Sequence, residues 1–173
     1  MSKAALKYGL ISGAMLAVFM AASTPFTLQE GTSLGVSETL GYISMFLSLV
    51  LIFFGIREHK IKALDGEIDF KEGLQVGATI AVISSLIYVV SWMIISGIYP
   101  EVNERIADMY RLDIEKEALS ELEKQEALAD VDKMFENYKN PFFKFGITLL
   151  EILPLGLIIA LASAFILRSK GDD

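Results

Sequence analysis

The chain has 173 residues, of which 53% are hydrophobic, and its mean hydropathy is +0.50. A soluble domain of this size needs a more polar surface, so the composition indicates a membrane protein. The absence of cysteine excludes disulfides, thiol catalysis and thiolate metal sites, and the net charge of −7 argues against nucleic acid as a partner.

The first apolar run covers residues 6–23 and follows Lys3 and Lys7. Gly9 and Gly13 lie four residues apart, on one face of a helix. A basic start and the small residues at 21–23 are also typical of a cleaved signal peptide. We favour a retained membrane helix because this run resembles a later one.

Residues 24–37 contain proline and two glycines and predict a short loop. The second apolar run, 38–56, is expected to end abruptly at residues 57–60, which are charged or histidine. The connection that follows has a predicted turn at Asp65-Gly66 and two apolar residues, Ile68 and Phe70, at strand-like or interfacial spacing.

The third run, 73–98, begins with Gly73 and Gly77, again four residues apart. Residues 71–78 match residues 7–14 at five of eight positions. Two interpretations are open, a parallel repeat of two helical hairpins and a chance recurrence of glycine-rich helix starts. Under either, the paired glycines are helix-packing positions that allow close helix contact.

Residues 100–141 form the one substantial polar segment, with twelve acidic and six basic residues. It has no internal glycine or proline, and its apolar residues recur every three or four positions, which predicts helix. Ser120 and Glu123 have the spacing of a capping box. We therefore predict two helices, over residues 101–118 and 121–139.

The fourth run, 142–167, is followed by Arg168 and Lys170. Basic residues gather at both chain ends and in the 57–71 connection, while residues 24–37 have none. By the positive-inside rule this predicts a multi-pass protein of a bacterial cytoplasmic (inner) membrane with both termini cytoplasmic. The expected fold is a single all-α membrane domain, with four transmembrane helices and an acidic extracytoplasmic helical insertion between the third and fourth.

Glu151 and Pro154 interrupt the middle of the last apolar run. An ionised side chain at that depth costs about 3 kcal/mol, so such a residue normally faces a bundle interior or a water-filled cavity. Proline leaves one carbonyl without its helical donor and tends to kink the helix. We interpret this pair as the polar centre of the protein.

Residues at a similar predicted depth are candidate partners of Glu151. Two hypotheses are open: Glu151 titrates and carries a proton or a cationic or hydroxylated group, or it is a protonated structural bridge between helices. Lys144 either reaches partway toward it or extends to the headgroups. The full candidate intramembrane site is Glu151, Pro154, Ser44, Ser48, Tyr88, Ser91 and Lys144.

The remaining signals point away from catalysis. His59 is the only histidine, and we expect a solvated loop residue rather than a metal ligand. Trp92, Tyr88 and Tyr99 are expected to be interfacial anchors and packing residues rather than a ligand cage. No catalytic triad, phosphate loop or nucleotide fingerprint is present, so we expect no enzyme, cofactor or metal.

Several segments resemble a bacterial family of small four-helix membrane proteins that is catalogued only as a domain of unknown function. The resemblance covers essentially the whole chain and is most specific at residues 140–142, 146–148 and 150–157, which include a Glu-x-x-Pro match at Glu151 and Pro154. It implies a four-helix inner-membrane architecture and assigns these two residues no role.

From these features we expect a non-enzymatic inner-membrane accessory or scaffold subunit that packs through its glycine faces and offers the acidic helices to a partner. The alternative is a small proton-coupled transporter, or a flippase for a lipid-linked intermediate, acting as a dimer around Glu151. A subunit of a membrane enzyme is the third possibility. The expected partners are the lipid bilayer and either a second copy of the chain or another membrane protein, with no nucleic acid.

Overall fold

A computed structural model describes residues 2–169, and within them every regular element is a helix. Four helical segments are long and apolar enough to cross a membrane, which agrees with the predicted number of candidate spans: Lys3–Thr27, Leu34–Ala63, Phe70–Ile98 and Pro141–Leu167. The helices in chain order are α1 Lys3–Thr27, α2 Leu34–Leu49, α3 Leu51–Ala63, α4 Phe70–Ile98, α5 Glu101–Lys116, α6 Glu121–Tyr138 and α7 Pro141–Leu167.

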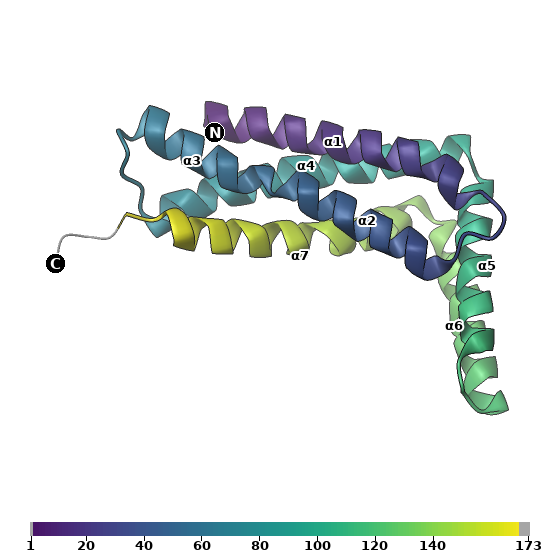
Figure 1. The fold of residues 1–173 in the computed structure, drawn as a ribbon. Coiled ribbons are helices and arrows are strands. Elements are labelled where there is room, and N and C mark those ends of the chain that lie inside the picture. Colours follow the sequence, from purple (N-terminus) through teal and green to yellow (C-terminus); the bar gives the residue numbers. More distant parts are fainter. Residues whose placement is uncertain (1, 170–173) are drawn as a thin grey trace.

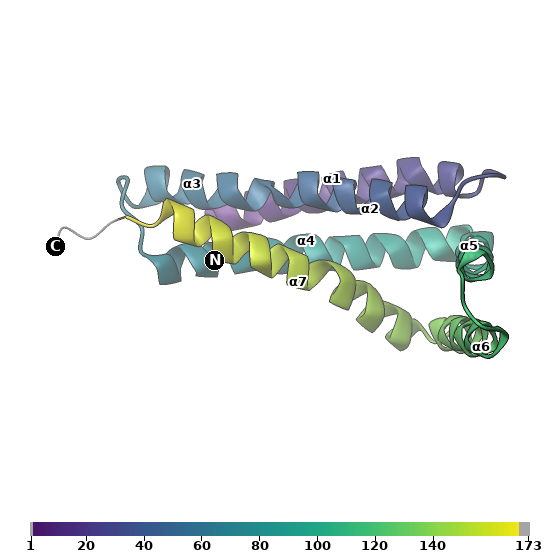
Figure 2. The same cartoon turned by 60° about the horizontal axis from the view of Figure 1, so that its bottom comes forward.

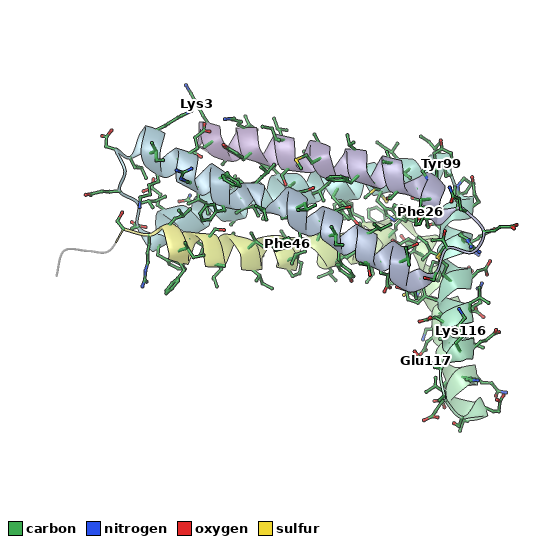
Figure 3. All side chains as sticks on the ribbon, in the orientation of Figure 1. Lys3, Phe26, Phe46, Tyr99, Lys116 and Glu117 are labelled. Carbon is green, nitrogen blue, oxygen red and sulfur yellow. The ribbon has the colours of Figure 1, made fainter. Side chains whose placement is uncertain are left out.

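The four long segments form a lengthwise bundle, and α5 and α6 project from one end of it (Figure 1). Lys3 and Leu167, where the first and last helices begin and end, lie at the opposite end. We call these the insertion end and the terminal end. In Figure 3 the side chains around the bundle, such as Phe46, point outward from their helices, and Lys116 and Glu117 mark the far part of the α5–α6 pair.

The second span differs from its predicted end at residue 56, because the helix continues as α3 through the charged residues to Ala63. Glu58 explains this extension. Its carboxylate accepts hydrogen bonds from Lys7 Nζ at 2.8 Å and Tyr8 Oη at 2.9 Å, and it pairs with Lys62 one turn on, so the polar segment is tied to α1. The same span is interrupted at Val50, between α2 and α3.

The loop predicted over residues 24–37 is also shorter than expected, since α1 extends to Thr27 with Pro25 inside its last turn. Hydroxyls support this end of the helix: Thr24 Oγ1 donates to the Met20 carbonyl at 2.8 Å, and Thr27 Oγ1 to the Ser23 carbonyl at 3.2 Å. Pro25 leaves the carbonyl four residues earlier without its helical donor, and because it lies in the last turn this disruption coincides with the end of the helix.

The connection from α3 to α4 contains the predicted turn, with positive φ at Asp65 (50°) and Gly66 (95°). The prediction that Ile68 and Phe70 are strand-like or lie at the interface is wrong. Ile68 is 3% exposed and belongs to the hydrophobic core, and its backbone exchanges two hydrogen bonds with Ser169, at 2.8 and 3.1 Å. Phe70 begins α4, so this segment closes the terminal end of the bundle.

Small residues let α4 pack closely against a helix on each side. Gly9 and Gly13 of α1 face Ile83 and Ile87 of α4. Further along the bundle, Gly73 and Gly77 of α4 face Ala164 and Ala160 of α7, and a β-carbon at Gly77 would lie 2.9 Å from the Ala160 β-carbon. The four glycines therefore pack helices of the same chain against one another.

The polar segment holds two helices, as predicted, and the capping box at Ser120 and Glu123 is confirmed. Val102, Met109 and Val131 of the apolar stripe are buried, and Ile106, Phe135 and Tyr138 line a cavity at the insertion end. The two helices thus turn their apolar side toward the bundle.

Candidate functional site: a cavity at the insertion end

A cavity of about 550 Å³ lies at the insertion end, where α7 diverges from α1 and α2 toward α6 (Figure 2). Six helices contribute to its wall, and apolar and aromatic side chains predominate in it. A volume of this size is typical of small-molecule sites. The polar side chains in the wall are Ser23, Thr24, Thr27, Ser37, Glu38, Tyr42, Ser44, Tyr88, Trp92, Asn103, Tyr110, Tyr138, Thr148 and Glu151.

Glu151 lines this cavity from α7 and is an exposed residue. The neighbouring Ile152 is fully buried in the core, so the helix turns the carboxylate to the cavity and the isoleucine to the packed interior. A carboxylate in this position can exchange protons with water or hold a ligand, provided that the cavity is filled with either.

Glu38 is a second carboxylate in the same wall, and it enters from the first turns of α2. The Tyr110 hydroxyl of α5 donates a hydrogen bond to its Oε1 at 2.9 Å. Burial raises the pKa of the Tyr110 phenol, and the hydrogen bond to Glu38 raises it further. Tyr110 therefore stays protonated and joins the insertion to the bundle on the α2 side.

A second set of hydrogen bonds joins α6 to α4 and α7. Trp92 Nε1 donates to Tyr138 Oη at 3.0 Å, and Tyr138 Oη lies 3.4 Å from Thr148 Oγ1. The Thr148 hydroxyl donates its proton to the Lys144 carbonyl at 2.8 Å. In the contact between Tyr138 and Thr148, the tyrosine hydroxyl is therefore the donor. Burial raises the pKa of the Tyr138 phenol, which keeps this donor in place.

The structure brings together only part of the site predicted from sequence. Glu151, Ser44 and Tyr88 line the cavity. The Ser44 hydroxyl donates to the Leu40 carbonyl of its own helix at 2.7 Å.

The other predicted residues lie elsewhere. Ser48 is fully buried and its carbonyl accepts from Ser12 Oγ at 2.8 Å, while Pro154 is exposed and Ser91 lies outside the wall of the cavity. Lys144 also lies outside it, with its Nζ 3.2 Å from Ser96 Oγ and 5.2 Å from the centre of the Tyr138 ring.

Several lining residues were not predicted as site members. In the sequence, Glu38 is typical of an acidic residue near the start of a helix, and Tyr110 and Tyr138 are typical of an amphipathic helix. Their spacing in the sequence therefore does not indicate that they share a cavity. Trp92, predicted only as an anchor and packing residue, also lies in the wall, whereas Tyr99 does not.

His59 is not the solvated loop residue that the sequence suggests. It lies within α3, its side chain is only 13% exposed, and its Nε2 is 3.3 Å from Glu72 Oε1 of α4. The helix extends past the predicted boundary, and this carries His59 against α4 at the terminal end.

Comparison with known families gives one match: the family described as "Protein of unknown function (DUF4199)" covers residues 7–169. This confirms the resemblance to a family catalogued only as a domain of unknown function. No curated protein and no solved structure matches the chain.

Proposed function

The chain belongs to this family of proteins of unknown function, DUF4199. From the cavity we propose that it is a membrane subunit that binds an amphiphilic molecule and has no enzymatic activity of its own. One observation carries the proposal. The 550 Å³ cavity combines apolar and aromatic walls with two carboxylates and several hydroxyls, and it lies in the part of the bundle where α7 leaves α2. A molecule with an apolar body and a polar group matches both kinds of lining.

The setting that we propose is a bacterial cytoplasmic membrane, with both termini cytoplasmic and α5 and α6 on the outer side. Basic residues near the terminal end support this orientation, because such residues are retained on the cytoplasmic side. Reporters fused behind Arg168 and between α5 and α6 test it. They should report opposite sides, and a common side would refute the topology.

The accessory role needs a surface for a second copy or for another membrane protein. The glycine faces already pack α1, α4 and α7 within one chain. We therefore place the partner on the acidic outer sides of α5 and α6, where Glu104, Asp108 and Asp132 are exposed. Crosslinking in native membranes from these positions, followed by identification of the attached protein, tests this placement.

Filling the cavity tests the binding proposal directly. Gly41 lines the cavity, and a β-carbon there would meet no atom within 4 Å, so Gly41→Phe adds bulk without a clash at its base. Gly146 of α7 is equally open but lies outside the wall, which makes Gly146→Phe the matched control.

Native mass spectrometry of the protein extracted in mild detergent should show a retained amphiphile on the parent and on Gly146→Phe, and none on Gly41→Phe. Retention by all three proteins, or by none, would contradict the proposal.

A second candidate is the proton-coupled transport or flipping of such a molecule by a dimer. The exposed Glu151 favours it, together with two places where a spanning helix can change shape near the middle: the break at Val50 and Pro154 within α7. In proteoliposomes, uptake driven by a pH gradient should then occur with the parent and fail with Glu151→Gln. Equal uptake by both would exclude proton coupling through this residue.

A further inference from the structure

We infer that the amphiphile bound in the cavity is a cation, specifically an organic ammonium compound with an apolar chain. This inference rests on the proposed binding function and narrows it to one class of ligand. Three features of the wall support it: the sign of its charges, its aromatic side chains and its apolar side chains, one of which reaches the outer surface of α7.

The charges in the wall have one sign. Glu38 and Glu151 are its two ionisable acids, and among residues 2–169 no lysine, arginine or histidine lines the cavity. Neither carboxylate joins an ion pair with a described residue. Both residues are exposed to the cavity, where two carboxylates without a cationic neighbour attract a ligand of opposite charge.

The basic side chains of the insertion end are engaged outside the cavity. Lys144 Nζ contacts Ser96 and the face of Tyr138, and Arg105 Nη2 donates to the Gln29 carbonyl at 3.0 Å. The positive charge that complements the two carboxylates is therefore expected from a bound molecule.

Aromatic side chains reinforce the preference for a cation. Tyr42, Tyr88, Trp92 and Tyr110 contribute to the wall, together with Tyr138, whose ring already carries the Lys144 ammonium 5.2 Å from its centre. The face of an aromatic ring attracts an ammonium group, and tryptophan and tyrosine do so most strongly. An anionic head group would be repelled by both carboxylates, and a neutral one would leave them without a counter-charge.

The apolar part of the ligand has its own place in the cavity. Leu16, Met20, Met45, Met134 and Leu150 supply apolar surface, and Leu150 is 68% exposed on the outside of α7. The apolar chain of a ligand can therefore lie against these side chains, and Leu150 brings the wall to the outer surface of α7. Methionine side chains adapt readily to irregular apolar groups.

Trp92 provides the readout because it is the only tryptophan in the chain and it lies in the wall. In lipid nanodiscs, 11-bromoundecylammonium should quench Trp92 fluorescence saturably, since bromine quenches on contact. The neutral 11-bromoundecanol and the anionic 11-bromoundecanoate should give only the unsaturable quenching of probes dissolved in the bilayer.

Removing both cavity charges should weaken the effect selectively. In Glu38→Gln/Glu151→Gln the apparent affinity for the ammonium probe is expected to fall about tenfold or more, as loss of two charge contacts implies. The control is Glu101→Gln/Glu104→Gln, which removes the same charge from α5 outside the wall and should bind like the parent. Both double variants must keep the parent's elution volume and helical circular dichroism.

The outcomes separate this inference from the function on which it rests. Saturable quenching of equal strength by all three probes would overturn the cation preference and leave amphiphile binding intact. An unchanged affinity in Glu38→Gln/Glu151→Gln would also overturn it. No saturable quenching by any probe, together with no retained amphiphile in native mass spectrometry, would refute both.

Discussion

The two ends of the bundle are built from different side chains. Toward the terminal end, Leu49, Ile52, Ile56 and Ile80 are fully buried, and Gly73 and Gly77 of α4 lie close to Ala164 and Ala160 of α7. At the insertion end, α7 diverges from α2, and aromatic rings, hydroxyls and two carboxylates surround a 550 Å³ cavity. Dense packing fixes the arrangement of the helices at one end, so the other can keep open space between them.

The packed end should tolerate added volume least. Gly77→Val places new atoms against Ala160 and Ile56, whose nearest atoms would lie 2.9 Å from the added β-carbon. Overpacking of this kind should lower the free energy of unfolding by about 3 kcal/mol. Thermal unfolding in detergent measures the effect.

Gly146→Val is the control for that change, because the surroundings of Gly146 are open within 4 Å. It should leave the melting temperature close to that of the parent. Equal melting temperatures for Gly77→Val and Gly146→Val would mean that the terminal end is not more closely packed between α4 and α7 than the insertion end.

Two buried serines near the middle of the bundle differ in one respect: the Ser12 hydroxyl donates a hydrogen bond, and the Ser85 hydroxyl has no partner among residues 2–169. Ser12→Ala leaves the Ser48 carbonyl without its 2.8 Å donor beside the break at Val50, at an expected cost of about 1.5 kcal/mol. Chemical or steric-trap unfolding in detergent quantifies it.

Ser85→Ala is the matched control, since the Ser85 hydroxyl is fully buried and has no hydrogen-bond partner among residues 2–169. This variant should be as stable as the parent or slightly more stable. A loss equal to that of Ser12→Ala would mean that burial of the hydroxyl, rather than its bond, sets the effect.

At the insertion end, Tyr138→Phe removes the acceptor of Trp92 Nε1 and the link to Thr148. We expect a loss of about 1 kcal/mol, because the Trp92 donor loses its partner in a partly buried position. The emission spectrum of Trp92 should shift as well. Tyr99→Phe, on an exposed residue, should change neither quantity, and a matching shift there would deny the role of the Trp92–Tyr138 bond.

The smallest effect concerns acid pH and the cap of α6. Hydrogen bonds from the Ser120 side chain and backbone lower the pKa of Glu123. The stabilisation by Glu123 is therefore present above its ordinary pKa, near 4.5, and is lost as pH falls through the lower value of the folded state.

The protection factors of amides at the start of α6, which compare measured exchange with the intrinsic rate at each pH, should accordingly fall below about pH 4.5 in the parent. In Glu123→Gln this fall should be absent, because the amide side chain does not titrate in that range. The same fall in both proteins would assign it to other groups.

The sequence alone determined that every regular element of residues 2–169 is a helix and that four helical segments are long and apolar, but not the break between α2 and α3 at Val50. The four candidate spans follow from the length of the apolar runs, the α3–α4 turn from Asp65-Gly66, and the start of α6 from Ser120 and Glu123. These features depend on residues close together in the chain, and local chemistry settles them.

Only the tertiary structure decided which polar residues meet. Glu38 and Glu151 share a cavity because α7 diverges from α2, and Ser48 turns away from it to pack beside Ser12. Likewise, α3 stays helical past residue 56 because Glu58 binds Lys7 and Tyr8. The rotation and tilt of each helix come from contacts with helices distant in sequence, and no periodicity within one segment records them.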